Sequence, residues 1–367
     1  IVLDKATDDA HDNPVMQIDK EGYVWIFSTS HGTGRPSFIH RSTTPYDISE
    51  FERVPATKMV NGKKVPLDNF SYLQVYYSDT SGFTGLFTHY EKKGGRVIAW
   101  MSSKDGKDWS EWKDLSLLGQ GQYQTSGNRA ELIGTSFNYH PDRKVRGGLD
   151  FRTNLYYLQT KDFGKTWQTA GGSAIDLPLS SVDNRALVRD YDSRERNVYI
   201  CDLNFDPRGR PIILYLTSRG PMPGPEDGPR IWHTAYWTGK RWRIRPFTTS
   251  GNNYDMGSLY VENRKWIVIA PTETGPQEYN TGGEMVLWKS GNKGRSWKSR
   301  QLTRNSEFNH TYARRPVNVH PGFYAFWADG HGREPSRSRL YFSDREGNVF
   351  VLPEVMDKPL MKPIPLK

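Results

Sequence analysis

The sequence predicts an all-β fold built from many short strands, on three observations. Aromatic residues and glycine are frequent, with 12 Trp, 20 Tyr, 16 Phe and 34 Gly among 367 residues, and these residues favour strands and tight turns. Short apolar runs alternate with turn sequences, and no stretch has the period of an amphipathic helix. No Pro-rich, Ser/Gly-rich or low-complexity segment marks a linker, so we expect residues 1–367 to form a single domain.

One turn sequence recurs with a tryptophan at its end. Its pattern is Ser/Thr-x-Asp/Asn-x-Gly-x-Ser/Thr-Trp, found at residues 160–167 and 290–297, shortened by one residue at 103–109 and more degenerate at 238–242. The copies follow apolar runs. The pattern suits a hairpin turn because Asp or Asn accepts hydrogen bonds from loop amides, Gly adopts a positive φ, and Trp packs beneath the loop.

These turns resemble the Asp-boxes of bacterial-neuraminidase-repeat (BNR) β-propellers, in which each box joins the third and fourth strands of a blade. Trp109 and Trp167 are 58 residues apart, and Trp167 and Trp297 are 130 residues apart, so a marked blade takes about 55 to 65 residues. The resemblance implies a sialidase-like β-propeller, and dividing 367 residues by this range gives six to seven blades. We predict a seven-bladed propeller, because some blades carry no box and are shorter, and we expect the boxes to be structural.

The first hairpin places two histidines opposite each other. Residues 15–18 and 23–29 are apolar and aromatic runs, and the turn sequence Asp-Lys-Glu-Gly separates them at 19–22. Strands folded about this turn pair residues whose numbers sum to 41 or 42, and 11 plus 31 is 42. Because opposed Cβ atoms in an antiparallel pair are about 5 Å apart, we expect His11 and His31 to touch one ligand at the open end of the hairpin.

The charge of the chain narrows the classes of partner. A formal net charge of +9 and a pI near 9.3 favour an anionic partner. The basic residues are scattered without a nucleic-acid-binding motif, and the aromatic content favours an anionic polysaccharide or oligosaccharide over nucleic acid. No apolar stretch is long enough for a membrane span. We expect a secreted or periplasmic protein whose signal peptide has been removed.

The sequence carries no recognisable metal-binding or phosphate-binding motif. Cys201, the single cysteine, lies in an apolar run and is interpreted as a buried structural thiol. Asp8, Asp9 and Asp12 have oxygen atoms to offer a cation, but capping of the first strand is the favoured role. We therefore expect that no cofactor is required, and a structural calcium ion is compatible with the sequence without being indicated by it.

Polar and aromatic residues gather in short stretches that recur at roughly blade intervals. In propellers the inner strands and their loops line a central funnel, which is the usual place for a ligand. We expect a subset of these residues to bind substrate: His89, Arg96, Tyr123, Arg152, Asn253, Tyr254, His310, Arg314 and Arg315.

The opening motif, His-Asp-Asn-Pro at 11–14 with His31 twenty residues after His11, resembles the start of BNR propellers that include ulvan lyases, rhamnose–glucuronate lyases and related α-L-rhamnosidases. The resemblance implies a lyase that cleaves next to a uronic acid by β-elimination, with His11, His31 and Tyr72 as catalytic residues. In those lyases a Tyr-Pro-x-Phe strand carries the acid/base Tyr, and an Arg sixteen residues later neutralises the substrate carboxylate. Here the matching strand is Ser-Tyr-Leu-Gln at 71–74, and position 88 is Thr.

The missing arginine leaves the reaction class open. A replacement from another strand is one answer, and Arg96, Arg152, Arg314 and Arg315 are the candidates. A glycoside hydrolase of the α-L-rhamnosidase type on the same scaffold is the first alternative, with Glu273 and Glu284 as carboxylates that need to lie about 5 to 9.5 Å apart. A non-catalytic glycan-binding propeller is the second alternative.

Overall fold

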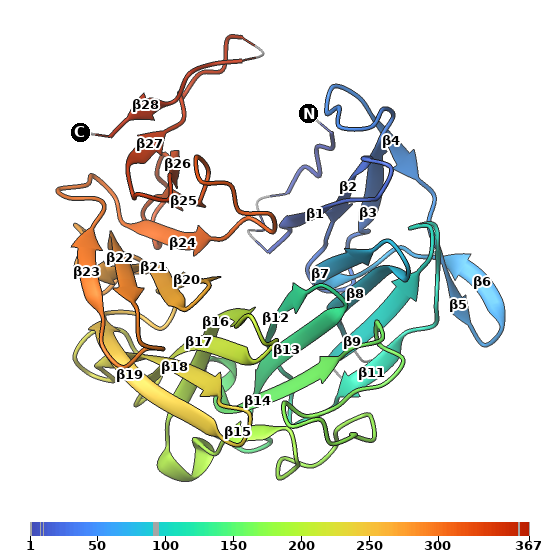
Figure 1. The fold of residues 1–367 in the computed structure, drawn as a ribbon, viewed down its shortest axis with the longest axis horizontal. Helices are drawn as coiled ribbons and strands as arrows, with labels where there is room; N and C mark the ends of the chain where they lie inside the picture. Colours follow the sequence, from blue (N-terminus) through green and yellow to red (C-terminus); the bar gives the residue numbers. More distant parts are fainter. Residues whose placement is uncertain (1, 8, 10, 91–94, 359, 367) are drawn as a thin grey trace. The chain divides into compact units, whose positions relative to one another are not determined.

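The computed structural model describes residues 2–7, 9, 11–90, 95–358 and 360–366 and consists of β-strands with two short 3₁₀ helices (Figure 1). The all-β prediction is therefore confirmed. Across these ranges we find no helix with the length and apolarity of a membrane span. The chain divides into two compact units, each described by itself below: unit 1 holds residues 1–142 and 156–187, and unit 2 holds residues 143–155 and 188–367. The single-domain expectation stays a prediction.

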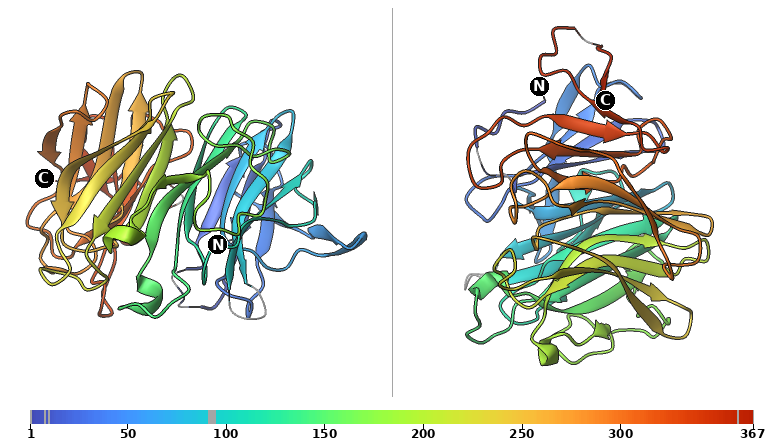
Figure 2. Two further views of the ribbon diagram at one scale, coloured as in Figure 1. Left: turned by 90° about the horizontal axis from the view of Figure 1, so that it is seen from below. Right: turned by 90° about the vertical axis from the view of Figure 1, so that its left-hand side faces the viewer.

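The first two sheets lie in unit 1. The first has the order β1-β2-β3-β4, with strands Pro14–Ile18, Val24–Ser28, Phe38–Ser42 and Phe51–Val54. The second has the order β6-β5-β10-β9-β8-β7, with β11 also on β9, and its strands β5 to β11 are Thr57–Val60, Lys63–Pro66, Ser71–Ser78, Gly82–Tyr90, Arg96–Ser103, Asp108–Trp109 and Lys113–Ser116. The β5–β6 hairpin projects from this sheet in Figures 1 and 2.

The division between the units falls inside the third sheet, which has the order β12-β13-β14-β15. Its strands are Gln124–Arg129, Leu132–Tyr139, Thr153–Thr160 and Leu187–Arg189. The two 3₁₀ helices, η1 and η2, are Gly148–Asp150 and Asp192–Arg194.

Unit 2 continues with three sheets whose strands follow chain order. The fourth sheet has strands β16 to β19, at Asn197–Phe205, Pro211–Ser218, Arg230–Trp237 and Trp242–Ser250. The fifth has β20 to β23, at Ser258–Glu262, Lys265–Glu273, Glu284–Ser290 and Lys298–Gln301. The sixth has β24 to β28, at His310–Arg314, Ala325–Asp329, Leu340–Ser343, Val349–Val351 and Ile364–Pro365.

The prediction of seven blades is wrong. The residues described above form six hydrogen-bonded sheets, five of four or five strands and one of seven. Two segments take up residues without forming a further sheet. One is the β5–β6 hairpin at 57–66, which joins the second sheet, and the other is the long connection between β14 and β15.

The Trp-ending turns follow the third strand of their sheets, as the Asp-box resemblance implied. The copies at 103–109 and 290–297 join β9 to β10 and β22 to β23. In the first of these, Asp105 Oδ1 accepts hydrogen bonds from the backbone N–H groups of Lys107 and Asp108 at 2.9 and 3.0 Å. The Trp109 ring is buried, and its Nε1 donates to the Gly106 carbonyl at 3.0 Å.

Apolar clusters lie between successive sheets of each unit. In the fifth sheet, Trp266 and Val268 point into one cluster with the fourth sheet, whereas Ile267 and Ile269 point into another with the sixth. This alternation follows from the two-residue period of a strand, which sends successive side chains to opposite faces. A strand that is apolar throughout is therefore covered on both faces, and the loops at strand ends are left to carry chemistry.

Candidate active site

The first hairpin brings His11 and His31 together, as predicted. β1 and β2 pair from Pro14 opposite Ser28 to Ile18 opposite Val24, so the paired numbers sum to 42. Asp19 fixes the turn, because its Oδ1 accepts from the Tyr23 backbone N–H at 2.9 Å. Beyond the last paired residues the two imidazoles stack, with ring centroids 4.2 Å apart and planes 21° from parallel.

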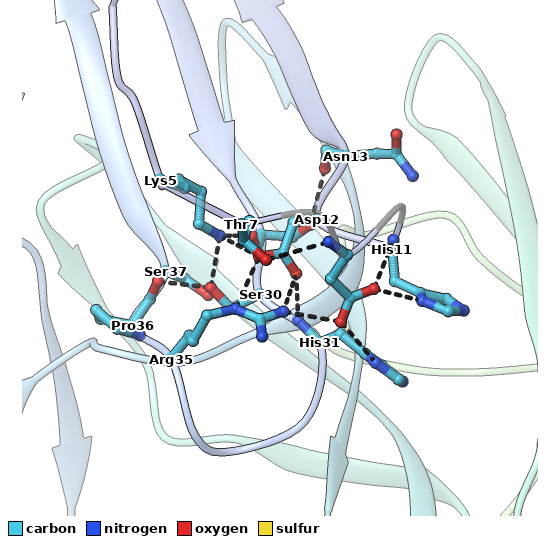
Figure 3. A network of polar contacts seen from close by, with 12 residues as sticks. Lys5, Thr7, His11, Asp12, Asn13, Ser30, His31, Arg35, Pro36 and Ser37 are labelled. Atoms are coloured by element: carbon cyan, nitrogen blue, oxygen red, sulfur yellow. Dashed lines mark hydrogen bonds and ion pairs between the residues drawn. The ribbon is translucent and has the colours of Figure 1, made fainter. Parts of the chain in front are cut away.

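A carboxylate lies behind the histidine pair. His11 Nδ1 is 2.6 Å from Asp9 Oδ1, and His31 Nδ1 is 3.2 Å from Asp9 Oδ2. Arg35 Nη2 donates to the same Oδ2 at 2.8 Å and to Asp12 at 3.1 Å. In Figure 3 the two imidazoles point to the same side, away from Ser37 and Pro36. The backbone N–H of His11, followed by Arg35, holds the pKa of the Asp9 carboxyl well below its usual range.

Asp12 fixes the loop that carries His31. Its Oδ1 accepts from the His31 backbone N–H at 2.7 Å, and Lys5 Nζ lies 2.9 Å from its Oδ2. Asp12 is nearly enclosed, with 3% of its side chain exposed, whereas His11 and His31 keep 52% and 30% exposed. The supporting groups are thus packed away, and the two rings remain open to a ligand.

Tyr72 closes the third side of the group. Its ring meets His11 and His31 edge-on, with centroids 6.0 and 5.8 Å away. The residue has φ +50°, an uncommon backbone conformation for a non-glycine residue, and it sits where the β7–β8 register shifts between Ser71 and Gln74. Such a bulge re-aims a side chain, and strain of this kind gathers at functional sites. Burial raises the pKa of the Tyr72 phenol, and the neighbouring phenols of Tyr123 and Tyr90 add to the rise.

Arg96, on the neighbouring strand, places a positive charge near Tyr72. Arg96 is the first residue of β9 and pairs with Tyr90 on β8. Its guanidinium carbon lies 5.0 Å from the ring centroid of Tyr123, whose ring is 5.6 Å from that of Tyr72. Arg96 also lowers the pKa of Tyr72 against the larger effect of burial. We call His11, His31, Tyr72 and Arg96 the histidine–tyrosine cluster.

Position 88, where the resemblance implied an arginine, is a threonine inside the sheet. Thr88 is buried and lies opposite Ser71 in the β7–β8 pairing. His89, predicted to bind substrate, also lies outside the cluster. Its Nε2 is 2.8 Å from Asp114 Oδ1, and its ring packs against Trp112 at 5.5 Å. Adjacent residues of a strand face opposite sides, so the ring of Tyr90 lies 6.2 Å from that of His31, whereas His89 faces away from the cluster.

Arg152 and Tyr254 meet in unit 2. Arg152 Nη2 donates to the Tyr254 hydroxyl at 2.9 Å, and that hydroxyl donates to Asp150 Oδ1 at 3.0 Å. The guanidinium carbon lies 4.6 Å from the Tyr199 ring centroid and 5.3 Å from that of Tyr254, within cation–π range. We call Asp150, Arg152, Tyr199 and Tyr254 the arginine box.

Two predicted substrate-binding residues are buried. Asn253 is buried, where its Oδ1 accepts from Arg230 Nε at 3.2 Å and its Nδ2 donates to the Gly220 carbonyl at 3.1 Å. His310 is also buried: Trp327 donates to its Nδ1 at 2.9 Å, and its Nε2 is 2.9 Å from the Ser306 hydroxyl. The polar atoms of both side chains are thus engaged within the protein, and their role in substrate binding stays a prediction.

Arg314 and Arg315 follow each other at the end of β24 but have different surroundings. Arg314 is exposed, and its guanidinium carbon is 5.4 Å from the Tyr312 ring centroid. Arg315 pairs with Asp202 Oδ1 at 3.3 Å. Arg314 is therefore the one of the two that faces solvent.

Asp9, His11 and His31 each offer one ligand atom within 4.8 Å of the others. In the structure the Asp9 carboxylate bonds the Nδ1 atoms of both rings, and the expectation that no cofactor is required stays a prediction. Asp8 lies outside the described residues. Cys201 is buried, as predicted, and burial raises the pKa of its thiol to about 12.

A cavity of about 410 Å³ adjoins the supporting carboxylates, lined by Leu3, Asp4, Lys5, Ala6, Thr7, Asp9, Asp12 and Ser28. Sequence reasoning weighed Asp9 as a strand cap or a cation ligand and did not single out Arg35 or Tyr90 as site residues. The contacts of Asp9 with both histidines and with Arg35 come from the structure. Tyr90 was detectable from its alternation with Thr88 along a strand.

Known proteins resemble this chain in sequence and in fold. A profile of the BNR repeat-containing family matches residues 1–250. An ulvan lyase of Nonlabens ulvanivorans is 25% identical over 331 residues, which are 80% of this chain and 65% of that enzyme. The chain therefore spans slightly less than two thirds of that relative's length.

Solved structures show the fold. A PL25 ulvan lyase superposes with a TM-score of 0.68 and 18% identity over 92% of this chain and 79% of that chain. A PL25 ulvan lyase bound to -[GlcA(1-4)Rha3S]- gives a TM-score of 0.66 and 17% identity with the same coverage. The all-β propeller predicted from the Asp-boxes is thus confirmed as a fold, with fewer blades than the predicted seven.

Proposed function

The chain belongs to the BNR repeat-containing family, and from this membership and the histidine–tyrosine cluster we propose that it is a polysaccharide lyase. The reaction is β-elimination next to a uronic acid in an ulvan-type polysaccharide. The observation that carries the proposal is the meeting of His11, His31 and Tyr72, with all three ring centroids within 6.0 Å of one another.

β-Elimination needs three groups, and the cluster offers each of them. A positive partner holds the uronate carboxylate so that the C5 proton becomes acidic. A base takes that proton, the C4–O4 bond breaks as the C4–C5 double bond forms, and an acid gives a proton to the leaving oxygen. The products are one chain ending in an unsaturated uronate and another with a new hydroxyl. No oxidant or reductant enters, and the proposal assigns no cofactor.

The environment of each group suggests its role. Burial raises the pKa of Tyr72, so its phenol is protonated near neutral pH and suits the general acid. The imidazoles are exposed and supply the base. Arg96, together with the second imidazole, faces the carboxylate and takes the place of the arginine missing at position 88. A phenolate base at Tyr72 would have to overcome the same burial.

The relatives support an anionic polysaccharide as the substrate. The matched ulvan lyases act on ulvan, and one is bound to a repeat of glucuronate and sulfated rhamnose. A chain with a formal charge of +9 attracts such a polyanion through its long-range field.

One of the two carboxylates that the hydrolase alternative needs, Glu284, is engaged inside the protein. Glu284 is buried and accepts hydrogen bonds from Thr303 Oγ1 and from the backbone and hydroxyl of Ser306. A carboxylate held in this way does not face a glycosidic bond. Glu273, its neighbour across β21 and β22, is exposed and has lost its proposed partner.

The proposal is tested by incubating the protein with ulvan and following both ultraviolet absorbance and reducing ends. A lyase produces both, because each cleavage creates an unsaturated uronate on one product and a new reducing end on the other. Reducing ends without the absorbance would indicate a hydrolase, and binding without product would indicate a glycan-binding protein. Either result contradicts the proposal.

Substitution then tests the site. We expect His11→Ala and His31→Ala each to lower kcat by about 10²–10⁴-fold, the usual contribution of general acid–base groups. His89→Ala is the matched control, since His89 is a histidine of the same unit bonded to Asp114 outside the cluster, and we expect near wild-type kcat. Equal activity of all three variants and the wild type would remove the site assignment.

A further inference from the structure

We propose that Asp9 is a positioning residue that fixes the same tautomer in both histidines and so prepares their Nε2 atoms for proton transfer. The inference rests on the proposed function for its catalytic consequence. Its structural content stands independently, because it concerns where the imidazole protons lie in the protein without substrate.

The carboxylate of Asp9 faces one nitrogen of each ring. Oδ1 lies 2.6 Å from His11 Nδ1, and Oδ2 lies 3.2 Å from His31 Nδ1. An ionised carboxylate only accepts hydrogen bonds, and a neutral imidazole has one donor and one acceptor nitrogen. Both Nδ1 atoms must therefore carry the proton, which leaves the lone pair of each neutral ring on Nε2.

The carboxylate is held in its ionised form and in place. Besides the rings, Oδ1 accepts from the His11 backbone N–H at 3.0 Å, and Oδ2 accepts from Arg35 Nη2 at 2.8 Å. Each oxygen thus has two donors, which use the roughly four lone-pair positions of a carboxylate. Arg35 is in turn fixed by Asp12. Asp9 has no acceptor capacity left for substrate, so it acts through the histidines.

The paired arrangement explains why two adjacent histidines point the same way. A single carboxylate with one oxygen for each ring aligns them almost parallel, 21° apart, on one side of the network in Figure 3. Carboxylates that orient an imidazole in this manner matter for rate. In serine proteases, changing such an Asp to Asn leaves the geometry intact and lowers kcat about 10⁴-fold through the wrong tautomer.

Asp9→Asn is the informative variant, because an amide has one acceptor oxygen and one donor nitrogen. Arg35 is the charged donor of this group, and charged donors form the stronger hydrogen bonds. We therefore expect the amide oxygen to face Arg35 and His31. The amide NH₂ then takes the place of Oδ1, so His11 Nδ1 must accept and His11 changes to the Nε2–H tautomer, while the His11 backbone N–H loses its acceptor. We expect kcat for ulvan cleavage to fall by about 10²–10⁴-fold.

The readout is a long-range ¹H–¹⁵N correlation spectrum of the neutral imidazoles, with His11→Gln and His31→Gln used to assign the signals. In the wild type we expect both rings to be Nδ1–H, and in Asp9→Asn we expect one ring, His11, to switch. Asp12→Asn is the matched control: Asp12 belongs to the same network but bonds the backbone of His31, so both rings should stay Nδ1–H.

An Nε2–H ring in the wild type, or two Nδ1–H rings in Asp9→Asn, would overturn the inference. Retained wild-type kcat in Asp9→Asn would overturn its catalytic part. These outcomes are separable from the proposed function, because the spectra report on the free protein. If the wild type cleaves no ulvan but shows the expected tautomers and switch, the proposed function fails while the positioning of the rings by Asp9 stands.

Discussion

Each unit gathers aromatic rings around polar groups, and the two clusters differ in what their reactive atoms contact. In the arginine box, the Tyr254 hydroxyl bonds both Arg152 and Asp150, and the guanidinium packs on two rings. In the histidine–tyrosine cluster, the bonds gather on the far side of the rings, at Asp9. The first arrangement satisfies its polar groups within the protein. In the second, Asp9 bonds the Nδ1 atom of each imidazole, and the two rings remain partly exposed.

This difference bears on how an active site is recognised. Both clusters contain tyrosine and a positive charge, so residue types do not separate them. The direction of the bonds and the exposure of the two imidazoles do, because a group that acts on substrate needs an atom that the protein has not already engaged. The proposed catalytic site therefore lies in unit 1, and the predictions below apply matched changes to the two clusters.

The largest contrast is expected between Tyr72→Phe and Tyr254→Phe, which remove the same atom. Tyr72→Phe removes the proposed general acid, so we expect kcat to fall by about 10²–10⁴-fold with an unchanged melting temperature. Tyr254→Phe removes two hydrogen bonds in the arginine box, so we expect a loss of stability of about 1–2 kcal/mol and a nearly unchanged kcat. Ulvan cleavage and urea unfolding measure both effects.

A reversal of this pattern would move the site. If Tyr254→Phe abolished turnover in a folded protein while Tyr72→Phe did not, the exposure argument would fail and the arginine box would be the better candidate. Circular dichroism of both variants shows whether a loss of activity reflects unfolding.

The arginines give the next contrast. Arg96 is the proposed partner of the substrate carboxylate, and removing one preorganised donor to a developing charge costs about 10²–10³-fold. We expect Arg96→Gln to lower kcat/KM by that amount on ulvan. Arg152→Gln should act mainly on stability, because its guanidinium is packed between Tyr199 and Tyr254. Similar kcat/KM values for Arg96→Gln and the wild type would show that no arginine on β9 replaces the one missing at position 88.

The sequence predicted the contact between His11 and His31, and the reason is local. His11 and His31 lie within one hairpin. The turn at 19–22 sets a register in which the numbers of paired residues sum to 42, and this register brings the two histidines into contact. The positive φ of Tyr72 has no sequence signal, although the residue itself was identified by resemblance. Asn253 and His310 were chosen by residue type, and their enclosure by Arg230 and Trp327 depends on contacts between distant segments.

The blade count failed for a related reason. The Asp-boxes mark the end of the third strand correctly, because each box is a turn whose hydrogen bonds join residues close in sequence. The number of sheets depends on how many residues lie between boxes without forming a new sheet. The β5–β6 hairpin joins an existing sheet by pairing with β10 in parallel, and local patterns do not reveal such a long-range pairing.

The smallest effect concerns a histidine of unit 2 and its response to acid. His233 in unit 2 is enclosed, stacked on Tyr215 with centroids 5.1 Å apart, and burial lowers its pKa from 6.5 to about 4. The unfolded chain therefore binds a proton more readily between these values, so His233 lowers stability as pH falls from 6.5 towards 4. At 1.36 kcal/mol for each pH unit, the loss from pH 7 to pH 5 is about 2 kcal/mol. We expect His233→Gln to reduce the difference in urea unfolding free energy between these pH values by that amount. An unchanged pH difference in His233→Gln would show that burial does not lower the proton affinity of this imidazole, and the prediction would fail.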